Sequence, residues 1–189
     1  MKSVVYAAAF GLMASLAPVS GFAQSVGIDF AAMPKGTTMF YTQNGREKWT
    51  EVYVGKRGKR FMTRVYSGHG TRGKLLSTVY WDQKGRRLYY TGGNRGYKYS
   101  FLPFDCAYQI GKCSHKERFV GEGYEGSGET QAWNARTSKT KGRYTTVWTR
   151  PKHEGKSAFL FTLGKYNLRT ETQWLSSSGL QTVKLVKVK

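Results

Sequence analysis

Acidic residues are scarce in this chain, and their scarcity is its strongest chemical signal. Only 11 of the 189 residues are Asp or Glu, against 31 Lys and Arg, so the formal net charge is +20. A charge of this size does not select a fold, but it governs solubility and favours association with anions. Two interpretations stay open: a surface that binds a negatively charged partner, or a solvated positive surface with no specific ligand.

Long apolar stretches are also lacking, apart from one at the N-terminus. Residues 4–18 are apolar, follow the single charge of Lys2 and precede Gly21 and Ala23, small residues at positions −3 and −1 of a cleavage site. This order is typical of a secretory signal peptide. The run is shorter than the roughly 20 residues of a spanning helix, which disfavours the alternative of a retained anchor. We expect residues 1–23 to be cleaved.

Export limits the possible partners. The short leader with one lysine is typical of a bacterial envelope protein, so we expect the mature protein in the periplasm or secreted, without a transmembrane span. Cytoplasmic nucleic acid is then excluded as a partner. Anionic lipid head groups, lipopolysaccharide, acidic polysaccharides, released nucleic acid and acidic proteins remain, and we expect an envelope lipid or polysaccharide. No cysteine lies near the cleavage site, which argues against a lipid anchor.

Cysteine is nearly absent too. The chain has two, Cys106 and Cys113, and an even pair in one loop of an exported protein predicts a disulfide. Six intervening residues do not match the Cys-x-x-Cys spacing of redox motifs. A zinc site needs more ligands, and His115 is the only nearby candidate. We therefore expect a structural disulfide and no metal or cofactor.

Helical apolar spacing is missing beyond the leader, and period-two segments recur instead. They are rich in Tyr, Thr, Val, Phe and Trp and are separated by short turns such as Asn44-Gly45. The pattern predicts a single β-rich domain over residues 24–189. The fold class is all-β: one antiparallel meander of about 10–11 strands, curled into a barrel-like or sandwich-like sheet. The segments are residues 37–43, 48–54, 60–67, 74–82, 86–91, 97–104, 130–137, 143–150, 157–164, 166–175 and 180–188.

One stretch of the chain does not follow this pattern. Residues 104–129 hold the cysteine pair and then a segment rich in glycine and glutamate. We expect an irregular, disulfide-stapled connection there between two β-rich halves. A connection of this length inside a domain is functional, mobile or the sign of an unrecognised strand.

Catalytic motifs are scarce. The three histidines, His69, His115 and His153, fall in expected loops without a second ligand at metal spacing, and no nucleophile elbow is present. The sequence thus predicts no catalytic residues. One alternative stays open, a hydrolase of envelope glycans or esters that uses a carboxylate pair. Its candidates are Glu117, Glu122, Glu125 and Glu129.

Basic residues gather at or beside two expected hairpin turns and a third, glycine-rich one. Arginine and lysine bind phosphate and carboxylate groups, and neighbouring aromatic rings add stacking surface. We expect whichever of Tyr89 and Tyr90 faces outward to contribute. The sequence thus predicts a non-catalytic protein that binds an anionic envelope lipid or polysaccharide, with a barrel-like carrier of an apolar ligand as the alternative. The candidate anion-binding residues are Arg57, Arg60, Lys84, Arg86, Arg87 and Arg95.

Overall fold

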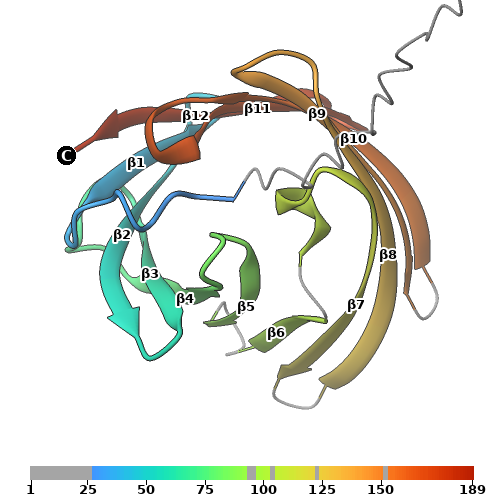
Figure 1. Cartoon of the computed structure of the whole chain (residues 1–189), viewed down its shortest axis with the longest axis horizontal. Helices are drawn as coiled ribbons and strands as arrows, with labels where there is room; N and C mark the ends of the chain where they lie inside the picture. Colours follow the sequence, from blue (N-terminus) through green and yellow to red (C-terminus); the bar gives the residue numbers. More distant parts are fainter. Residues whose placement is uncertain (1–26, 93–96, 103–104, 122–123, 151–152) are drawn as a thin grey trace, which may run out of the picture.

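A computed structural model of the protein describes residues 27–92, 97–102, 105–121, 124–150 and 153–189 (Figure 1). The expected signal peptide lies outside the described residues. Within them the chain forms twelve strands and two short 3₁₀ helices. In chain order these are β1 (Thr38–Gln43), β2 (Glu47–Arg57), β3 (Arg60–Ser67), β4 (Leu75–Trp81), β5 (Arg87–Gly92), β6 (Tyr97–Leu102), η1 (Cys106–Tyr108), β7 (Gly111–Gly121), β8 (Tyr124–Arg136), β9 (Lys141–Arg150), β10 (His153–Leu163), η2 (Lys165–Asn167), β11 (Arg169–Ser176) and β12 (Gly179–Val188).

The strands form one antiparallel meander that closes into a barrel, as Figure 1 shows down the barrel. Each strand pairs with its neighbours in sequence, and β1 pairs with both β2 and β12. Closure brings Met39 opposite Val188, so the first and last strands share a ladder. The expected all-β meander is confirmed. It has twelve strands, and because the sheet closes on itself it forms a barrel and not a sandwich. Among the described residues no helix is long and apolar enough to cross a membrane.

The expected irregular connection over residues 104–129 is much shorter than the sequence pattern indicates. Strands β7 and β8 occupy most of it and pair along their length, from Gly111 opposite Asn134 to Gly121 opposite Tyr124. The non-strand part that the structure describes there is residues 105–110. This corrects our expectation. Strand β7 and residues 124–129 of β8 do not show the period-two pattern, because several of their inward positions carry polar side chains or glycine in place of apolar residues.

One end of the barrel is plugged by residues 27–37, which cross it before β1 begins (Figure 1). The backbone N–H of Ile28 donates to the carbonyl of Gly85 over 3.0 Å, and that of Asp29 donates to Tyr166 over 2.8 Å. Gly85 has a φ of +68°, and a Cβ there would lie 1.9 Å from the carbonyl oxygen of Ile28. The close approach of the plug therefore requires glycine in the β4–β5 turn.

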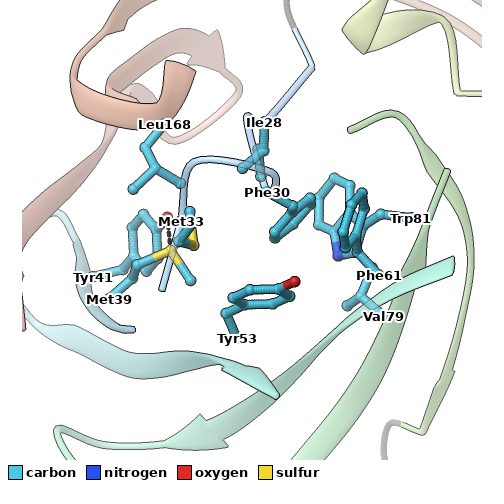
Figure 2. Close-up of a cluster of buried hydrophobic side chains, with 10 residues drawn as sticks. All are labelled: Ile28, Phe30, Met33, Met39, Tyr41, Tyr53, Phe61, Val79, Trp81 and Leu168. Carbon is cyan, nitrogen blue, oxygen red and sulfur yellow. Dashed lines mark hydrogen bonds between the residues drawn. The ribbon is translucent and has the colours of Figure 1, made fainter. Parts of the chain in front are cut away.

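The plug carries the largest hydrophobic cluster, drawn in Figure 2. The ring of Phe30 lies 5.1 Å from that of Tyr53, 5.2 Å from Phe61 and 5.4 Å from Trp81, measured between centroids. A fully buried side chain of this size stabilises a fold by about 1.5–3 kcal/mol. The cluster thus fastens the N-terminal segment across strands β2 to β4 and closes this end. The buried members are Ile28, Phe30, Met33, Met39, Tyr41, Tyr53, Phe61, Val79, Trp81 and Leu168.

Candidate functional site

Two of the basic turns that the sequence singled out lie at the same end of the barrel. Antiparallel strands place every second connection at one end, so the β2–β3 and β4–β5 turns both lie at the plugged end. Arg57 and Arg60 face each other across the first turn as the last pair of the β2–β3 ladder. Lys84 lies in the second turn. Arg95 lies outside the described residues.

Asp82 organises the β4–β5 turn. Its Oδ1 accepts hydrogen bonds from the backbone N–H of Lys84 at 2.9 Å and of Arg86 at 2.8 Å. The Arg86 guanidinium also pairs with Oδ2 at 2.7 Å. Short aspartate side chains commonly stabilise turns in this way. Arg86 is therefore engaged within its own turn.

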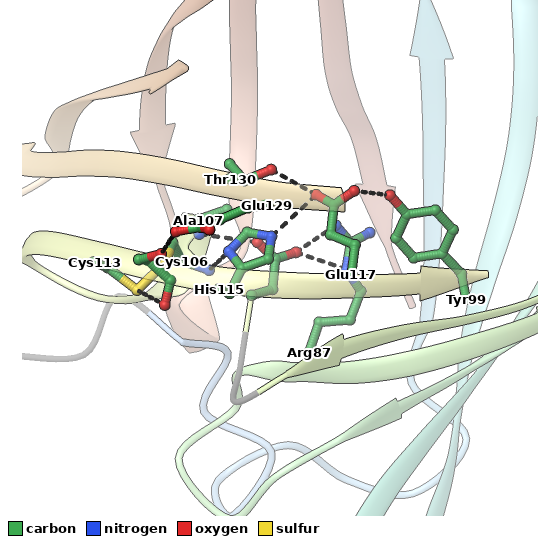
Figure 3. Close-up of polar contacts among 11 residues, drawn as sticks. Arg87, Tyr99, Cys106, Ala107, Cys113, His115, Glu117, Glu129 and Thr130 are labelled. Carbon is green, nitrogen blue, oxygen red and sulfur yellow. Dashed lines mark hydrogen bonds and ion pairs between the residues drawn. A yellow bond between two sulfur atoms is a disulfide. The ribbon is translucent and has the colours of Figure 1, made fainter. Parts of the chain in front are cut away.

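Arg87 lies apart from the other candidates because its side chain points into the barrel (Figure 3). Its Nε donates to Oδ2 of Asp105 over 2.8 Å, and its Nη2 donates to the same oxygen. The guanidinium carbon is 4.5 Å from the centroid of Phe101. Burial lowers the pKa of Arg87, but the Asp105 carboxylate together with Tyr108 and Tyr90 raises it by more, so the pKa is raised overall. The guanidinium stays charged and paired.

A β-bulge explains this orientation. In the β4–β5 ladder Tyr80 pairs with Tyr89, yet the next residue, Trp81, pairs with Arg87, so Leu88 is skipped. Simple alternation would put Arg87 on the same face as Tyr89. The extra residue instead turns Arg87 toward the side of the buried Trp81.

The outer face of β3 to β6 carries a group of cations and tyrosines, which we name the outer patch. The Tyr89 hydroxyl accepts a hydrogen bond from Nη1 of Arg60 at 3.0 Å. The Arg60 guanidinium carbon and Nζ of Lys98 lie 5.5 Å and 5.4 Å from the Tyr89 centroid. Tyr80 stacks on Tyr89 with centroids 4.4 Å apart. The outer patch consists of Arg60, Arg64, Tyr80, Tyr89 and Lys98.

The outer patch overlaps the predicted set only at Arg60. Of the tyrosine pair, Tyr89 faces outward, while Tyr90 packs parallel to the inward-facing Tyr99 at 5.3 Å. Arg64 was not in the predicted set because it lies within β3, away from the turns at which that set was gathered. Its sequence signal was the alternation with Phe61, Thr63 and Val65, which places both arginines of β3 on one face.

Inside the barrel a second polar group centres on Glu117 (Figure 3). Its Oε1 accepts a hydrogen bond from the Thr130 hydroxyl at 2.7 Å and lies 3.2 Å from Nε2 of His115. The Tyr99 hydroxyl donates to Oε2. Glu117 is only 5% exposed. Buried carboxylates are tolerated when donors surround them, and this one has donors from three strands.

The neighbouring backbone fixes the tautomer of His115. Its Nδ1 lies 3.1 Å from the backbone N–H of Cys106, which is a donor, so Nδ1 must accept. In the neutral ring the proton is then on Nε2 and points at Glu117. His115 thus lies inside the barrel, not in a loop as the sequence indicated.

The predicted disulfide is present. Cys106 and Cys113 are bonded, with their Cα atoms 5.6 Å apart. The bond ties η1 to the start of β7. The side chain of Asp105 accepts from the backbone N–H of Ala107 at 2.9 Å, which caps η1. The stapled loop therefore positions both Asp105 and the Cys106 N–H against the interior polar group.

Two adjoining hollows lie within the barrel. One has a volume of about 390 Å³ and extends from Asp105 to Trp148. The other has a volume of about 370 Å³ and extends from Tyr90 to Glu47 at the start of β2. Tyr90 lines both. We call the larger of them the lumen pocket. Small-molecule sites commonly have volumes of about 300–1,000 Å³.

The outer face of β7 to β10 has a wider and more apolar hollow of about 810 Å³. Trp133, which is 59% exposed, and Val147 line it together with Lys112 and Lys156. It lies on the opposite side of the sheet from the lumen pocket, because its exposed residues alternate with inward ones such as Ala132 and Thr146.

The glutamates considered for hydrolysis do not come together. Glu117 points inward, whereas Glu125 and Glu129 are exposed on the outer face of β8. Glu125 pairs there with Arg118, and Glu129 accepts from Ser114 at 2.7 Å. Glu122 lies outside the described residues. Within the described part of the chain no cluster of three His, Cys, Asp or Glu residues is arranged to hold a metal ion.

Comparisons with known proteins address the fold. No protein-family model matches the sequence, and no curated protein matches it. Among solved structures, a provisionally described exported protein with a YmcC-like fold from Bacteroides fragilis matches with a TM-score of 0.50 and 9% identity, over 82% of this chain and 96% of that chain.

Two further structures are similar. The hypothetical lipoprotein YmcC from Escherichia coli has a TM-score of 0.44 and 10% identity, over 84% of this chain and 92% of its own. A provisionally described lipoprotein from Parabacteroides distasonis has a TM-score of 0.45 and 7% identity, over 88% and 99%. Their descriptions state no activity, and the disulfide of the present chain accords with export. At such identities the Bacteroides fragilis match shows the fold alone: this chain has a YmcC-like barrel fold.

Proposed function

We propose that this protein is an exported, non-catalytic binding protein that holds an anionic component of the cell envelope on the outer patch. The ligand class is a phosphate- or carboxylate-bearing lipid head group, lipopolysaccharide or acidic polysaccharide. Its working compartment is the bacterial periplasm or the outside of the cell. The finer choice among these anions is left to the experiment below.

The observation that carries the proposal is the pair of cations on one tyrosine. Arg60 and Lys98 approach the Tyr89 ring from neighbouring strands. Within the described residues neither they nor Arg64 pair with a carboxylate. Cations held on an aromatic face and left without an internal counter-ion are available for an external anion.

The distribution of acids strengthens the argument. Asp105 and Glu117 are buried in the lining of the lumen pocket, whereas Arg87 is the cation that accompanies them there, so this lining removes more negative than positive charge from the outer surface. The ratio of basic to acidic residues is therefore higher on the outside of the barrel than in the chain as a whole. Long-range attraction of a polyanion follows from this excess.

Binding to vesicles and to a polyuronate tests the proposal. Vesicles of phosphatidylglycerol, vesicles of phosphatidylcholine and soluble alginate are compared, each at low and high salt. We expect binding to at least one of the two anionic probes, none to phosphatidylcholine, and a steep loss with salt because exposed charges are screened. Binding that is unchanged by salt, or equal on both lipids, contradicts the proposal.

A matched pair of variants locates the site. Arg60→Gln with Lys98→Gln removes two charges from the outer patch, and Arg143→Gln with Lys156→Gln removes two from the outer faces of β9 and β10. We expect the first to weaken binding about tenfold, or about 1.4 kcal/mol, and the second to have a much smaller effect. Equal losses would mean that net charge alone drives binding.

A further inference from the structure

The lumen pocket differs in chemistry from the outer patch. Six aromatic side chains line it, and tyrosine and tryptophan supply flat faces with polar tips. Tyr90 and Tyr99 stack with an angle of 2° between their planes, and Tyr144 and Phe159 stack at 29° with centroids 5.7 Å apart. The aromatic lining residues are Tyr90, Tyr99, Phe101, Tyr144, Trp148 and Phe159.

Polar groups complete the lining of the lumen pocket. Glu117 is held in place by its three donors, so its carboxylate cannot turn away from the pocket. Thr146 and Ser157 face each other across the β9–β10 ladder and also line the pocket. Within the described part of the chain neither hydroxyl has a hydrogen-bond partner. They offer donors and acceptors to a ligand at fixed positions.

The lumen pocket also lacks the excess positive charge of the outer surface. The one guanidinium in its lining, Arg87, is paired with Asp105, and Glu117 shares its carboxylate with His115. An anionic ligand would lose its hydration here without gaining a free cation. The lining thus favours an uncharged ligand over the anions that suit the outer patch.

We propose that the lumen pocket binds an uncharged, hydroxyl-bearing ring, that is, a neutral sugar residue. The ring face stacks on the aromatic walls, and its hydroxyl groups exchange hydrogen bonds with Glu117, Thr146 and Ser157. This site is separate from the outer patch and does not depend on the proposed function. A binding result at the lumen pocket therefore neither supports nor contradicts anion binding at the outer patch.

The route into the lumen pocket is at the end opposite the plug. The second hollow shares Tyr90 with the pocket and reaches Glu47 and Lys48, which are exposed at the start of β2. Glycines occupy inward positions on this side of β8 and β10. At Gly155 the ring of Trp148 lies where a Cβ would be, 2.3 Å from that position. Small inward residues therefore let an aromatic wall lie flat against the sheet.

Calorimetric titration of the mature protein tests the proposal. The probes are methyl β-glucoside and N-acetylglucosamine at millimolar concentration, with glucuronate and choline as charged counterparts. We expect at least one neutral sugar to bind and neither charged probe to bind in the lumen. Binding of no neutral sugar overturns the proposal, as does binding of choline in their place, which would make the pocket an aromatic cage for a cation.

Two tryptophans on neighbouring strands give a matched comparison. Trp148→Ala removes a wall of the lumen pocket, and Trp133→Ala removes an exposed ring from the outer face of β8. We expect at least a tenfold loss of sugar affinity in the first and none in the second. Thr146→Val, which keeps shape and fold, should weaken binding several-fold. Sugar binding unaffected by both Trp148→Ala and Thr146→Val overturns the proposal.

Discussion

Nε2 of His115 lies 3.2 Å from Oε1 of Glu117, and both side chains point into the barrel from β7. The other ring nitrogen accepts from the backbone N–H of Cys106 at 3.1 Å. A chain of hydrogen bonds thus runs from the disulfide loop through the imidazole to the carboxylate. The loop that staples η1 to β7 therefore also orients the polar side of the lumen pocket.

We expect Tyr99→Phe to destabilise the protein by about 1–3 kcal/mol, because it removes a donor from a buried carboxylate. The measurement is the free energy of unfolding in urea. Tyr89→Phe is the control, since it loses only the exposed hydrogen bond from Arg60 and should cost less than about 1 kcal/mol. Similar costs for both variants would show that the donor to Glu117 adds nothing.

Arg87→Met should cost about 3 kcal/mol, because it leaves Asp105 buried without its cation. The Asp105 side chain is 3% exposed, while that of Arg87 is 31% exposed, which places the effect at the lower end of the usual range. Arg118→Met is the comparison, since the Arg118–Glu125 pair is more than half exposed and should contribute at most about 1 kcal/mol. Chemical denaturation measures both. The prediction fails if the two variants are equally stable.

The burial of Glu51 leads us to expect that the stability of the protein depends on pH. Burial raises its pKa above the ordinary value of 4.5, so the folded protein holds this proton more tightly than the unfolded chain does. The contribution of Glu51 to stability is then fully present below pH 4.5 and is lost as the pH rises through the raised folded pKa. Within the described residues its buried Oε1 has no hydrogen-bond partner, in keeping with that direction.

Thermal unfolding of Glu51→Gln between pH 4 and 7 tests this dependence. We expect the melting temperature of the variant to rise relative to the wild type as the pH increases, since the glutamine does not ionise. Glu47→Gln, at the exposed start of the same strand, serves as the control. A constant difference between Glu51→Gln and the wild type over this range would rule out the assigned cause.

Removing the disulfide should destabilise the protein by about 2.5 kcal/mol on the chain-entropy estimate for so short a loop. The double variant Cys106→Ala with Cys113→Ala is compared with the wild type in urea. Because the loop also orients His115, sugar affinity of the lumen pocket should fall in the same variant. Full retention of that affinity would show that the loop keeps its position without the covalent bond.

Much of the fold could be predicted because it depends on neighbouring residues. The Asn44-Gly45 turn is an example: both residues have positive φ, 51° and 70°, which a type I′ turn requires and which Asn and Gly tolerate best. The cysteine pair was also a local signal. Strand β7 and the first half of β8, residues 124–129, were not predicted, because the inward His115 and Glu117 are polar and are satisfied by each other and by Thr130. Such partners are invisible in the sequence.

The candidate site was predictable only in outline. Charge composition indicated cations on the surface, but Arg86 and Arg87 are adjacent in sequence and lie in different places. Arg86 is held in its turn by Asp82, and the bulge at Leu88 sends Arg87 inward to Asp105. A bulge shifts the alternation by one residue, and its position depends on the neighbouring strand. Hence only Arg60 of the predicted set joins the outer patch.

The sequence by itself determined the antiparallel meander, its disulfide and its excess of positive charge, since period-two alternation, turn residues and composition are properties of short segments. Only the tertiary structure decided that β1 pairs with β12, which side of each strand faces inward, and that a polar pocket lies inside. Closure joins residues from the two ends of the chain, such as Met39 and Val188. Alternation specifies that neighbours point apart, but closure decides which of them faces the interior.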